Sequence, residues 1–249
     1  MKIFAVSNHK GGVGKTTSTV NIGAALALKK NRVLLIDLDP QSNLTQSLGV
    51  KGGTTNIYDN LRGDNTVVPI KVGQNLWIIP SSLDLSAAEI ELNSEPGREY
   101  ILKNIISSTE DVFDYVIIDC PPSLGLLTIN ALTAAHSVFI PLQAEYLPLN
   151  GLAKLNDIID KIRNRLNPSL SVGCVFLTQY DPRKVLNREI ADMVKEFYGD
   201  KMLETKISNN VALAEAPSQG KDIFSYNKNS KGASDYIDLC EELLRKGVA

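Results

Sequence analysis

Residues 9–17 read His-Lys-Gly-Gly-Val-Gly-Lys-Thr-Thr and directly follow an apolar run that is typical of a β-strand. A glycine-rich loop between a strand and a helix lets successive backbone N–H groups turn toward one anion, and the helix N-terminus adds partial positive charge. Lys15 would supply a full charge to the β- and γ-phosphates of a nucleotide, and Thr16 is placed to ligate Mg²⁺. The stretch therefore predicts a phosphate-binding loop, in which a further lysine, Lys10, has no obvious role.

Two predicted strands end in acidic residues. The apolar run at residues 33–36 ends in Asp37, with Asp39 just past it, and the run at residues 115–118 ends in Asp119. Ligands of open α/β sheets sit beyond the carboxyl ends of the strands, so these carboxylates belong with the glycine-rich loop. Asp119 is expected to hold the Mg²⁺ shell through water, and Asp39 to organise the attacking water near the γ-phosphate, with Asp37 as a close rival.

Short apolar runs alternate with longer segments of helical period along the whole chain. Strands are predicted at residues 2–7, 32–37, 76–79, 115–119, 137–141 and 172–177, and helices at residues 16–28, 124–135, 149–166 and 185–198. This alternation is typical of βαβ units, and several strands are apolar almost throughout, as burial of both sheet faces requires. We therefore expect a single α/β domain spanning residues 1–249, with a mostly parallel twisted sheet covered by helices on both faces.

Two segments stand apart from this alternation. Residues 49–73 are the least regular part and predict an excursion with one short helix at residues 57–61. Residues 233–246 predict a C-terminal helix with one apolar stripe. The stripe carries Tyr236, Ile237, Leu239, Cys240, Leu243 and Leu244, whereas Asp238, Glu241, Glu242 and Arg245 lie elsewhere. We expect this helix to dock on the sheet rather than on a membrane, because its polar face is more acidic than basic.

The overall composition limits the classes of function. Hydrophobic residues make up 43% and charged residues 22%, which is ordinary for a soluble globular protein. The net charge is −2, so contact with nucleic acid would need a local basic patch. The apolar stretches are too short for a membrane span, and the start of the chain has no signal-peptide layout, which favours a cytoplasmic location. Cys120, Cys174 and Cys240 are widely spaced, which favours buried reduced thiols over a disulfide framework or a zinc site.

Three motifs and their spacing form a specific combination. They read Lys-Gly-Gly-Val-Gly-Lys-Thr-Thr at residues 10–17, Asp-Leu-Asp-Pro-Gln at residues 37–41 and Asp-Cys-Pro-Pro at residues 119–122. Together they resemble the deviant Walker A ATPases and, within them, the ParA/Soj-type partition ATPases. The resemblance runs nearly end to end and includes Leu-Ala-Glu-Ala-Pro-Ser at residues 213–218. It implies a P-loop NTPase fold and a Mg²⁺-dependent ATPase.

The resemblance suggests a role for the second lysine. In family members with a lysine at the Lys10 position, two ATP-bound subunits pack face to face and this lysine reaches the partner's nucleotide. A cation supplied in trans to the phosphates makes dimerisation depend on the triphosphate. The alternative is a solvated loop lysine that helps its own phosphate. The resemblance implies catalytic roles for Lys10, Lys15 and Asp39, and nucleotide contacts from Lys10, Gly11, Gly12, Val13, Gly14, Lys15, Thr16 and Thr17. It also implies metal-site roles for Thr16 and Asp119.

The base of the nucleotide is expected to be adenine. A GTPase of this general design would carry Asn-Lys-x-Asp after a late strand, whereas residues 178–181 read Thr-Gln-Tyr-Asp after the strand at residues 172–177. This difference favours ATP, as does the resemblance. The segment from Asn210 to Pro217 is the candidate wall of the adenine site.

ParA-like proteins are similar in using the ATP dimer to bind DNA without sequence preference, while a ParB-like partner on the cargo triggers hydrolysis. Here Arg183, Lys184 and Arg188 gather at a predicted helix start, and a two-fold dimer would double this patch. Family members commonly read Pro-Arg-Asn-Val-Arg where residues 208–212 read Ser-Asn-Asn-Val-Ala, so both arginines are missing. Lys206 is expected to compensate. The alternative is that these charges form only a solvated helix face.

Several rival functions share the same nucleotide site. A MinD-like, membrane-cycling ATPase needs a basic amphipathic C-terminal helix, and a cluster-carrying iron protein needs cysteines that meet at a dimer interface. A ParA-like protein that positions another cargo fits almost as well as a partition protein. A DNA-binding scaffold with negligible turnover, or a repressor, comes from a different class. The strand-end carboxylates favour hydrolysis, which we expect to be slow until a partner completes the site. The ATP-bound form would then associate with the nucleoid, not with a membrane.

Overall fold

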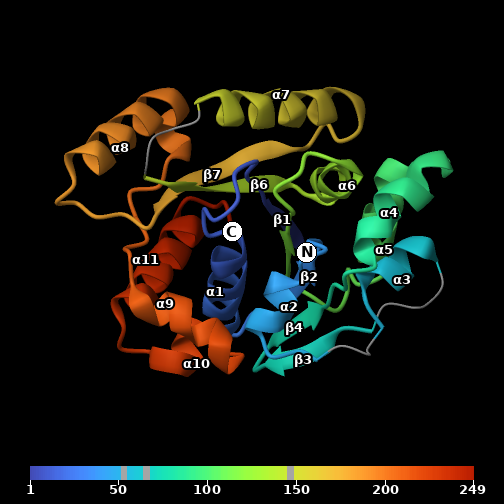
Figure 1. The fold of residues 1–249 in the computed structure, drawn as a ribbon, viewed down its shortest axis with the longest axis horizontal. Coiled ribbons are helices and arrows are strands. Elements are labelled where there is room, and N and C mark those ends of the chain that lie inside the picture. The colour runs from blue at the N-terminus through green and yellow to red at the C-terminus, as the bar shows by residue number, and fades with distance from the viewer. Residues whose placement is uncertain (52–54, 64–67, 145–148) are drawn as a thin grey trace.

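The computed structural model describes residues 1–51, 55–63, 68–144 and 149–249. Their centre is a seven-stranded sheet with the order β3-β4-β2-β5-β1-β6-β7 (Figure 1). The strands are β1 (Lys2–Val6), β2 (Val33–Asp37), β3 (Ile70–Gly73), β4 (Leu76–Ile79), β5 (Tyr115–Asp119), β6 (Ser137–Gln143) and β7 (Ser171–Thr178). Every neighbouring pair is parallel except β3 and β4. The mostly parallel α/β sheet predicted from the sequence is thereby confirmed.

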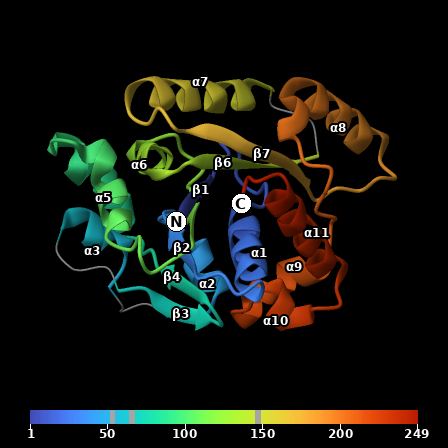
Figure 2. The same cartoon turned by 180° about the vertical axis from the view of Figure 1, so that it is seen from behind.

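Helices cover both faces of this sheet. The α-helices are α1 (Lys15–Leu28), α2 (Asn43–Ser47), α3 (Ile57–Arg62), α4 (Leu85–Glu91), α5 (Ile101–Ser107), α6 (Leu126–Ala134), α7 (Leu149–Arg165), α8 (Val185–Tyr198), α9 (Val211–Glu215), α10 (Ile223–Asn227) and α11 (Lys231–Arg245). Single 3₁₀ turns are η1 (Leu92–Ser94), η2 (Arg98–Tyr100), η3 (Gly199–Lys201) and η4 (Ala216–Gln219). The two views agree that α7 and α8 lie along the β6–β7 edge and that α1 and α11 lie side by side (Figures 1 and 2).

Two hydrophobic cores form because successive side chains of a strand point to opposite faces of the sheet. On β1, Ala5 packs into one core with α6, α7 and α8, whereas Phe4 packs into the other core with α1 and α11. On β2, Leu34 and Leu35 divide in the same way, and all four of these side chains are buried. Burial on both faces explains why these strands read as continuous apolar runs.

The C-terminal helix α11 packs beside α1 in the core on one face of the sheet, in agreement with the prediction that it docks on the sheet. Tyr236, Leu239 and Leu243 are fully buried in the core that this helix shares with α1. The expectation for Glu242 is wrong, because its side chain is only 2% exposed instead of lying on the polar face. Its carboxylate accepts hydrogen bonds from the backbone N–H groups of Glu204 and Thr205, at 2.8 and 2.9 Å. Donors supplied by an adjacent chain segment satisfy a buried carboxylate, and a helical pattern does not reveal them.

The irregular region after β2 is only partly described. The short helix expected at residues 57–61 is present as α3, which begins with a capping box between Asn56 and Asp59. The remainder of the predicted excursion includes residues 52–54 and 64–67, which lie outside the described residues. Strand β3, which sequence patterning missed, pairs antiparallel with β4 at the sheet edge and is half-buried. Its four residues are too short for a clear alternation of apolar and polar positions.

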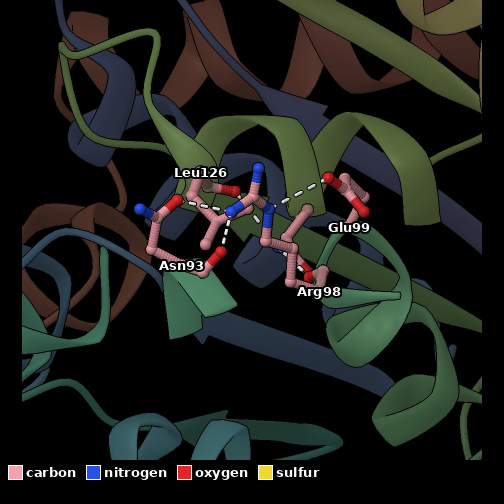
Figure 3. Close-up of polar contacts among 5 residues, drawn as sticks. Asn93, Arg98, Glu99 and Leu126 are labelled. Carbon is pink, nitrogen blue, oxygen red and sulfur yellow. Dashed lines mark hydrogen bonds and ion pairs between the residues drawn. The ribbon is translucent and has the colours of Figure 1, made fainter. Parts of the chain in front are cut away.

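Helices α4 and α5 were also not predicted, and both bury apolar side chains in the core, Leu85 and Ala88 from α4 and Leu102 and Ile106 from α5. The Arg98 side chain donates to Asn93 and to Glu99, the latter over 3.1 Å (Figure 3). The Asn130 side-chain amide on α6 donates to the Arg98 carbonyl at 2.8 Å and to the Leu126 carbonyl at 3.1 Å. The bond between Asn130 and Arg98 fastens the α4–α5 segment to α6, the helix that follows Asp119, and the Leu102 N–H adds a second bond to Oδ1 of Asn130 at 3.1 Å.

Candidate functional site

The glycine-rich loop leaves β1 and enters α1 at the carboxyl edge of the sheet. Gly12 and Gly14 have φ angles of +74° and +84°, in the left-handed region that favours glycine. The Thr178 hydroxyl at the end of β7 donates to the Val13 carbonyl at 2.9 Å. These features hold the loop in a turn that aims the start of α1 outward, which is the geometry of an anion site.

Lys15 lies in this turn as the first residue of α1. Its side chain is largely buried, and its ammonium donates to the Lys10 carbonyl at 3.1 Å. Burial lowers the pKa of Lys15, while the Asp119 carboxylate opposes that shift. A buried ammonium that donates to a neutral loop carbonyl gains from a bound anion, because the anion replaces the charge stabilisation lost on leaving water. The location is therefore suited to a polyphosphate.

Asp119 lies beneath the loop at the end of β5. Its Oδ2 accepts a hydrogen bond from the Thr16 hydroxyl at 2.7 Å, and its Oδ1 lies 3.2 Å from the Thr19 hydroxyl. Burial raises the pKa of Asp119, and the charge of the nearby Asp37 carboxylate adds to this effect. A threonine hydroxyl beside a carboxylate is a set of hard oxygen donors that fits Mg²⁺. Thr16 and Asp119 were predicted for this position from the sequence, whereas Thr19 was not.

The two acidic residues at the end of β2 differ in their surroundings. The Asp37 carboxylate is fully buried and accepts from the Thr45 N–H at 2.8 Å, from the Thr45 hydroxyl at 2.6 Å and from the Asp39 N–H at 3.2 Å. Burial raises the pKa of Asp37 to about 6. Asp39 instead lines the space in front of the glycine-rich loop. Asp37 is therefore placed to stabilise the turn that follows β2, whereas Asp39 is placed to face a ligand.

Two hollows adjoin each other at this edge of the sheet. The phosphate hollow, of about 430 Å³, lies over the glycine-rich loop and is lined by Gly11, Gly12, Gly14, Lys15, Thr16, Thr17, Asp39, Gln41, Asn43, Ser47, Pro122 and Gln179. The side hollow, of about 280 Å³, is lined by Gly14, Thr17, Thr178, Gln179, Ile207, Ser208, Asn209, Asn210, Leu213, Ala214 and Tyr236. Gly14, Thr17 and Gln179 line both. One elongated ligand with a phosphate end and a second end can thus occupy the two.

The residues predicted for the adenine wall separate in the structure. Asn210 lines the side hollow and caps α9, where its Oδ1 accepts from the Ala212 N–H at 3.1 Å. Pro217 is half-buried in η4 and is not among the residues that line either hollow. The side chain of Val13 is buried, so only the backbone of this residue is available for contact with a nucleotide. Ser208 and Asn209 supply further polar groups to the side hollow.

Lys10 lies at the rim of the site. Its N–H donates to Oδ1 of Asn8 at 3.0 Å, and its ammonium donates to Oε1 of Gln143 at 3.4 Å. It is not among the residues that line the phosphate hollow. The structure therefore places Lys10 beside the loop rather than over its own phosphate site.

Sequence reasoning missed several residues of the site. Gln41 and Pro122 line the phosphate hollow and belong to motifs that were quoted for their carboxylates alone. Gln179 was noticed only because its segment lacks a guanine-binding motif, yet it lines both hollows. Its φ of +51° is unusual for a residue other than glycine, and sequence patterning gave no signal for that conformation.

The predicted basic patch gathers at the start of α8, on the loop after β7. Arg183 has 88% of its side chain exposed and contacts Asp181 through two hydrogen bonds of 2.9 Å. These bonds with Arg183 lower the pKa of Asp181 to about 2. Lys184 and Arg188 are exposed on the same turn. The ammonium of Lys206 lies 5.0 Å from the ring centre of Tyr180, so a distant lysine is brought beside this loop.

Among the described residues, no helix is both long and apolar enough to cross a membrane. The three cysteines are buried free thiols, as expected.

Comparison with known proteins gives consistent relatives. A family model described as an AAA domain matches residues 1–172. The chromosome-partitioning ATPase Soj of Treponema pallidum is 46% identical over 248 residues, which cover 98% of this chain and 98% of that protein. The sporulation initiation inhibitor protein Soj of Bacillus subtilis is 46% identical over 251 residues, which cover 99% of each.

Solved structures share the fold over nearly the whole chain. Cobyrinic acid a,c-diamide synthase from Mycobacterium smegmatis, with a bound ATP analogue and magnesium, gives a TM-score of 0.86 at 37% identity and covers 98% of this chain and 95% of that one. A Cyanothece McdA variant in complex with ATP gives a TM-score of 0.88 at 25% identity, with 98% and 96% covered.

Proposed function

This chain belongs to the Soj/ParA family of chromosome-partitioning ATPases, and from that premise we propose that it is an ATP-dependent dimeric switch in partition. In this proposal it binds ATP with Mg²⁺, pairs with a second copy and binds DNA without sequence preference. A ParB-like partner then stimulates hydrolysis and resets the switch.

One observation carries the nucleotide part of the proposal. Lys15, Thr16 and Asp119 come together under a loop in which two glycines have backbone φ angles in the left-handed region. Lys15 begins α1, Thr16 follows it, and Thr16 bonds to Asp119 at 2.7 Å. The phosphate hollow in front of them continues into the side hollow. That shape suits a nucleotide with its phosphates at α1 and its base against Ser208, Asn209 and Asn210.

The residues that would hold Mg²⁺ are Thr16, as a direct ligand, and Asp119, through water. When bound, the metal would neutralise charge on the phosphate oxygens. Lys15 would bind and orient the same phosphates. Asp39 lines the phosphate hollow, and one of its oxygens, Oδ1, accepts from the Gln41 N–H at 2.9 Å. A carboxylate anchored in this way can orient a water molecule toward the terminal phosphate.

Lys10 is the residue proposed to make dimerisation depend on the triphosphate. It lies at the rim of the loop, where a partner's nucleotide could meet it, rather than inside its own phosphate hollow. An ammonium that meets a partner's phosphates forms a charge-assisted contact, and such contacts are stronger than a bond to a neutral amide. In this position Lys10 would also distinguish ATP from ADP, because the diphosphate presents less negative charge at the dimer interface.

The DNA surface is proposed to be the turn that carries Arg183, Lys184 and Arg188, with Lys206 beside it. Exposed cations on one turn suit phosphate contacts without base readout. Two copies in a dimer double the number of contacts, so a weak site becomes useful only in the ATP-bound state. Lys206 supports the expectation that another cation replaces the arginines missing at residues 209 and 212.

The proposal is tested by molar mass in solution with ATP, with ADP and without nucleotide. The chain should dimerise with ATP but not with ADP or without nucleotide. Lys15→Ala should lose nucleotide binding, whereas Lys10→Ala should retain it and stay monomeric. Lys29→Ala is a matched control, because this exposed lysine pairs with Glu241 at the far end of α1. A Lys10→Ala protein that dimerises normally would remove the proposed role of Lys10.

A further inference from the structure

A chain of side-chain amides connects Lys10 to the loop that holds the phosphates. The Lys10 ammonium donates to Oε1 of Gln143 at 3.4 Å, and Nε2 of Gln143 donates to Oε1 of Gln179 at 2.9 Å. Nε2 of Gln179 then donates to the Gly12 carbonyl at 3.0 Å. We name Gln143 and Gln179 the glutamine chain.

The two ends of the glutamine chain fix its direction. A lysine ammonium only donates hydrogen bonds and a backbone carbonyl only accepts them. Gln143 must therefore present its oxygen to Lys10, which leaves its NH₂ group for Gln179. Gln179 in turn must present its NH₂ group to Gly12. Each amide is used once as donor and once as acceptor, so a change at either end affects the whole chain.

The backbone places Gln179 where it can meet a ligand and places Gln143 beside Gln179. Gln143 ends β6 and pairs in register with Thr178 on β7, directly before Gln179. Gln179 has a φ of +51°, a backbone conformation that few residues other than glycine adopt, and its side chain is held by the bonds to Gln143 and to the Gly12 carbonyl. It is also one of the residues shared by the phosphate hollow and the side hollow. A nucleotide that occupies both hollows would meet Gln179 at their junction.

We propose that Gln143 and Gln179 are positioning residues for Lys10, which hold its ammonium in the monomer and release it when a nucleotide displaces Gln179. This inference rests on the proposed function and deepens it. The bond that holds Lys10 is a partly exposed contact with a neutral amide, so a partner's phosphates can outcompete it. Loss of the contact with Gln179 deprives Gln143 of the partner that orients it, and Lys10 becomes available in trans.

Two substitutions at one position should shift dimerisation in opposite directions. Gln143→Ala removes the holding bond, whereas Gln143→Glu replaces it with an ion pair and keeps the size of the side chain. The quantity measured is the protein concentration at which half of the chains are dimeric in the presence of a non-hydrolysable ATP analogue. We expect this concentration to be about tenfold lower for Gln143→Ala than for the unmodified chain. This is about threefold for each of the two lysines of the dimer. Gln143→Glu should need about tenfold more protein.

Two further variants test the connection itself. Gln179→Ala should shift the midpoint in the same direction as Gln143→Ala, by about threefold, because Gln143 then loses only its orienting partner. In a Lys10→Ala background, the difference between Gln143→Ala and Gln143→Glu should vanish. A shift of both Gln143 variants in the same direction, or a difference that persists without Lys10, would overturn the inference.

A second measurement needs no dimer. In the nucleotide-free monomer, the rate at which an acylating reagent modifies Lys10, followed by mass spectrometry, should rise in Gln143→Ala and fall in Gln143→Glu. Lys29 provides the internal reference rate. If the unmodified chain fails to dimerise with ATP, the proposed switch is wrong, while these rates still decide whether the glutamine chain holds Lys10. Equal Lys10 rates in all three proteins would overturn the inference.

Discussion

The Thr16 hydroxyl donates a 2.7 Å hydrogen bond to Oδ2 of Asp119, joining the first turn of α1 to the end of β5 across a sequence separation of 103 residues. The bond sets the two oxygen donors of the proposed Mg²⁺ site in a fixed relation before any ligand arrives. Thr19, one turn further along α1, lies 3.2 Å from the other carboxylate oxygen. The carboxylate is thus held at both ends.

Loss of the carboxylate charge should remove the dependence of nucleotide binding on Mg²⁺. We expect Asp119→Asn to weaken ATP binding in the presence of Mg²⁺ by about tenfold or more, and to change binding in EDTA far less. Titration calorimetry with and without Mg²⁺ measures this. Thr19→Val is the matched control, because it removes an orienting bond and leaves both proposed Mg²⁺ donors in place; an equal loss in that variant would argue against a metal role for Asp119.

The turn after β2 should depend on Thr45. Its hydroxyl donates to Asp37 at 2.6 Å and accepts from the Ser81 N–H at 3.0 Å. Thr45→Ala leaves a buried carboxylate and a buried N–H short of a partner, so we expect the free energy of unfolding to fall by about 1–3 kcal/mol. Denaturant unfolding measures the change, and Thr45→Ser should restore most of it. A Thr45→Ala chain of unchanged stability would show that water replaces both bonds.

The ion pair between Arg183 and Asp181 should compete with DNA. Arg183→Ala should lower DNA affinity about tenfold and reduce the slope of log affinity against log salt by about 2 in a dimer. Asp181→Asn releases the same guanidinium and should raise affinity about threefold. Both are measured by fluorescence anisotropy on two unrelated duplexes, with molar mass as a check on the dimer. Unchanged binding in both variants would move the DNA surface elsewhere.

Acid should weaken the fold through His136. Its Nδ1 accepts a hydrogen bond from the Ile3 N–H at 3.0 Å, which requires an unprotonated nitrogen. Burial lowers the pKa of His136, with the N-terminal ammonium and Lys103 adding to this effect and Glu110 opposing it. Because the folded state then binds the proton less well than the unfolded state, stability should be constant above about pH 6.5 and should fall below it.

The matched variant for this pH effect is His136→Asn, which keeps an acceptor near the same position without a titrating group. Its free energy of unfolding should lose less than that of the unmodified chain between pH 7 and pH 5. Parallel pH curves for the two proteins would assign the acid sensitivity to other groups.

Much of the fold follows from local sequence pattern. The boundaries of β5 agree with the apolar run that predicted it, because burial on both faces of the sheet demands a continuous apolar strand. The boundaries of α8 agree with the segment of helical period that predicted it. The pattern failed for β3 and for helices α4 and α5, which are short and peripheral. Tertiary partners such as Arg98 and Asn130 hold that region, and they carry no periodic signal.

The candidate site was predictable where its residues lie within recognisable motifs. Lys15, Thr16 and Asp119 were found because strand ends and glycine loops have recognisable chemistry. Gln143 and Gln179 were not, since their meeting depends on the register between β6 and β7. The burial of Glu242 likewise depends on the N–H groups of a distant segment.

We expect the bound nucleotide to control DNA binding by this chain. The most direct test is DNA binding by Asp39→Ala with ATP, with ADP and without nucleotide, alongside molar mass, because loss of hydrolysis should trap the active state. We expect a dimer that forms and binds DNA only when ATP is present. DNA binding that is equal in all three conditions, or an ATP dimer that does not bind DNA, would contradict it.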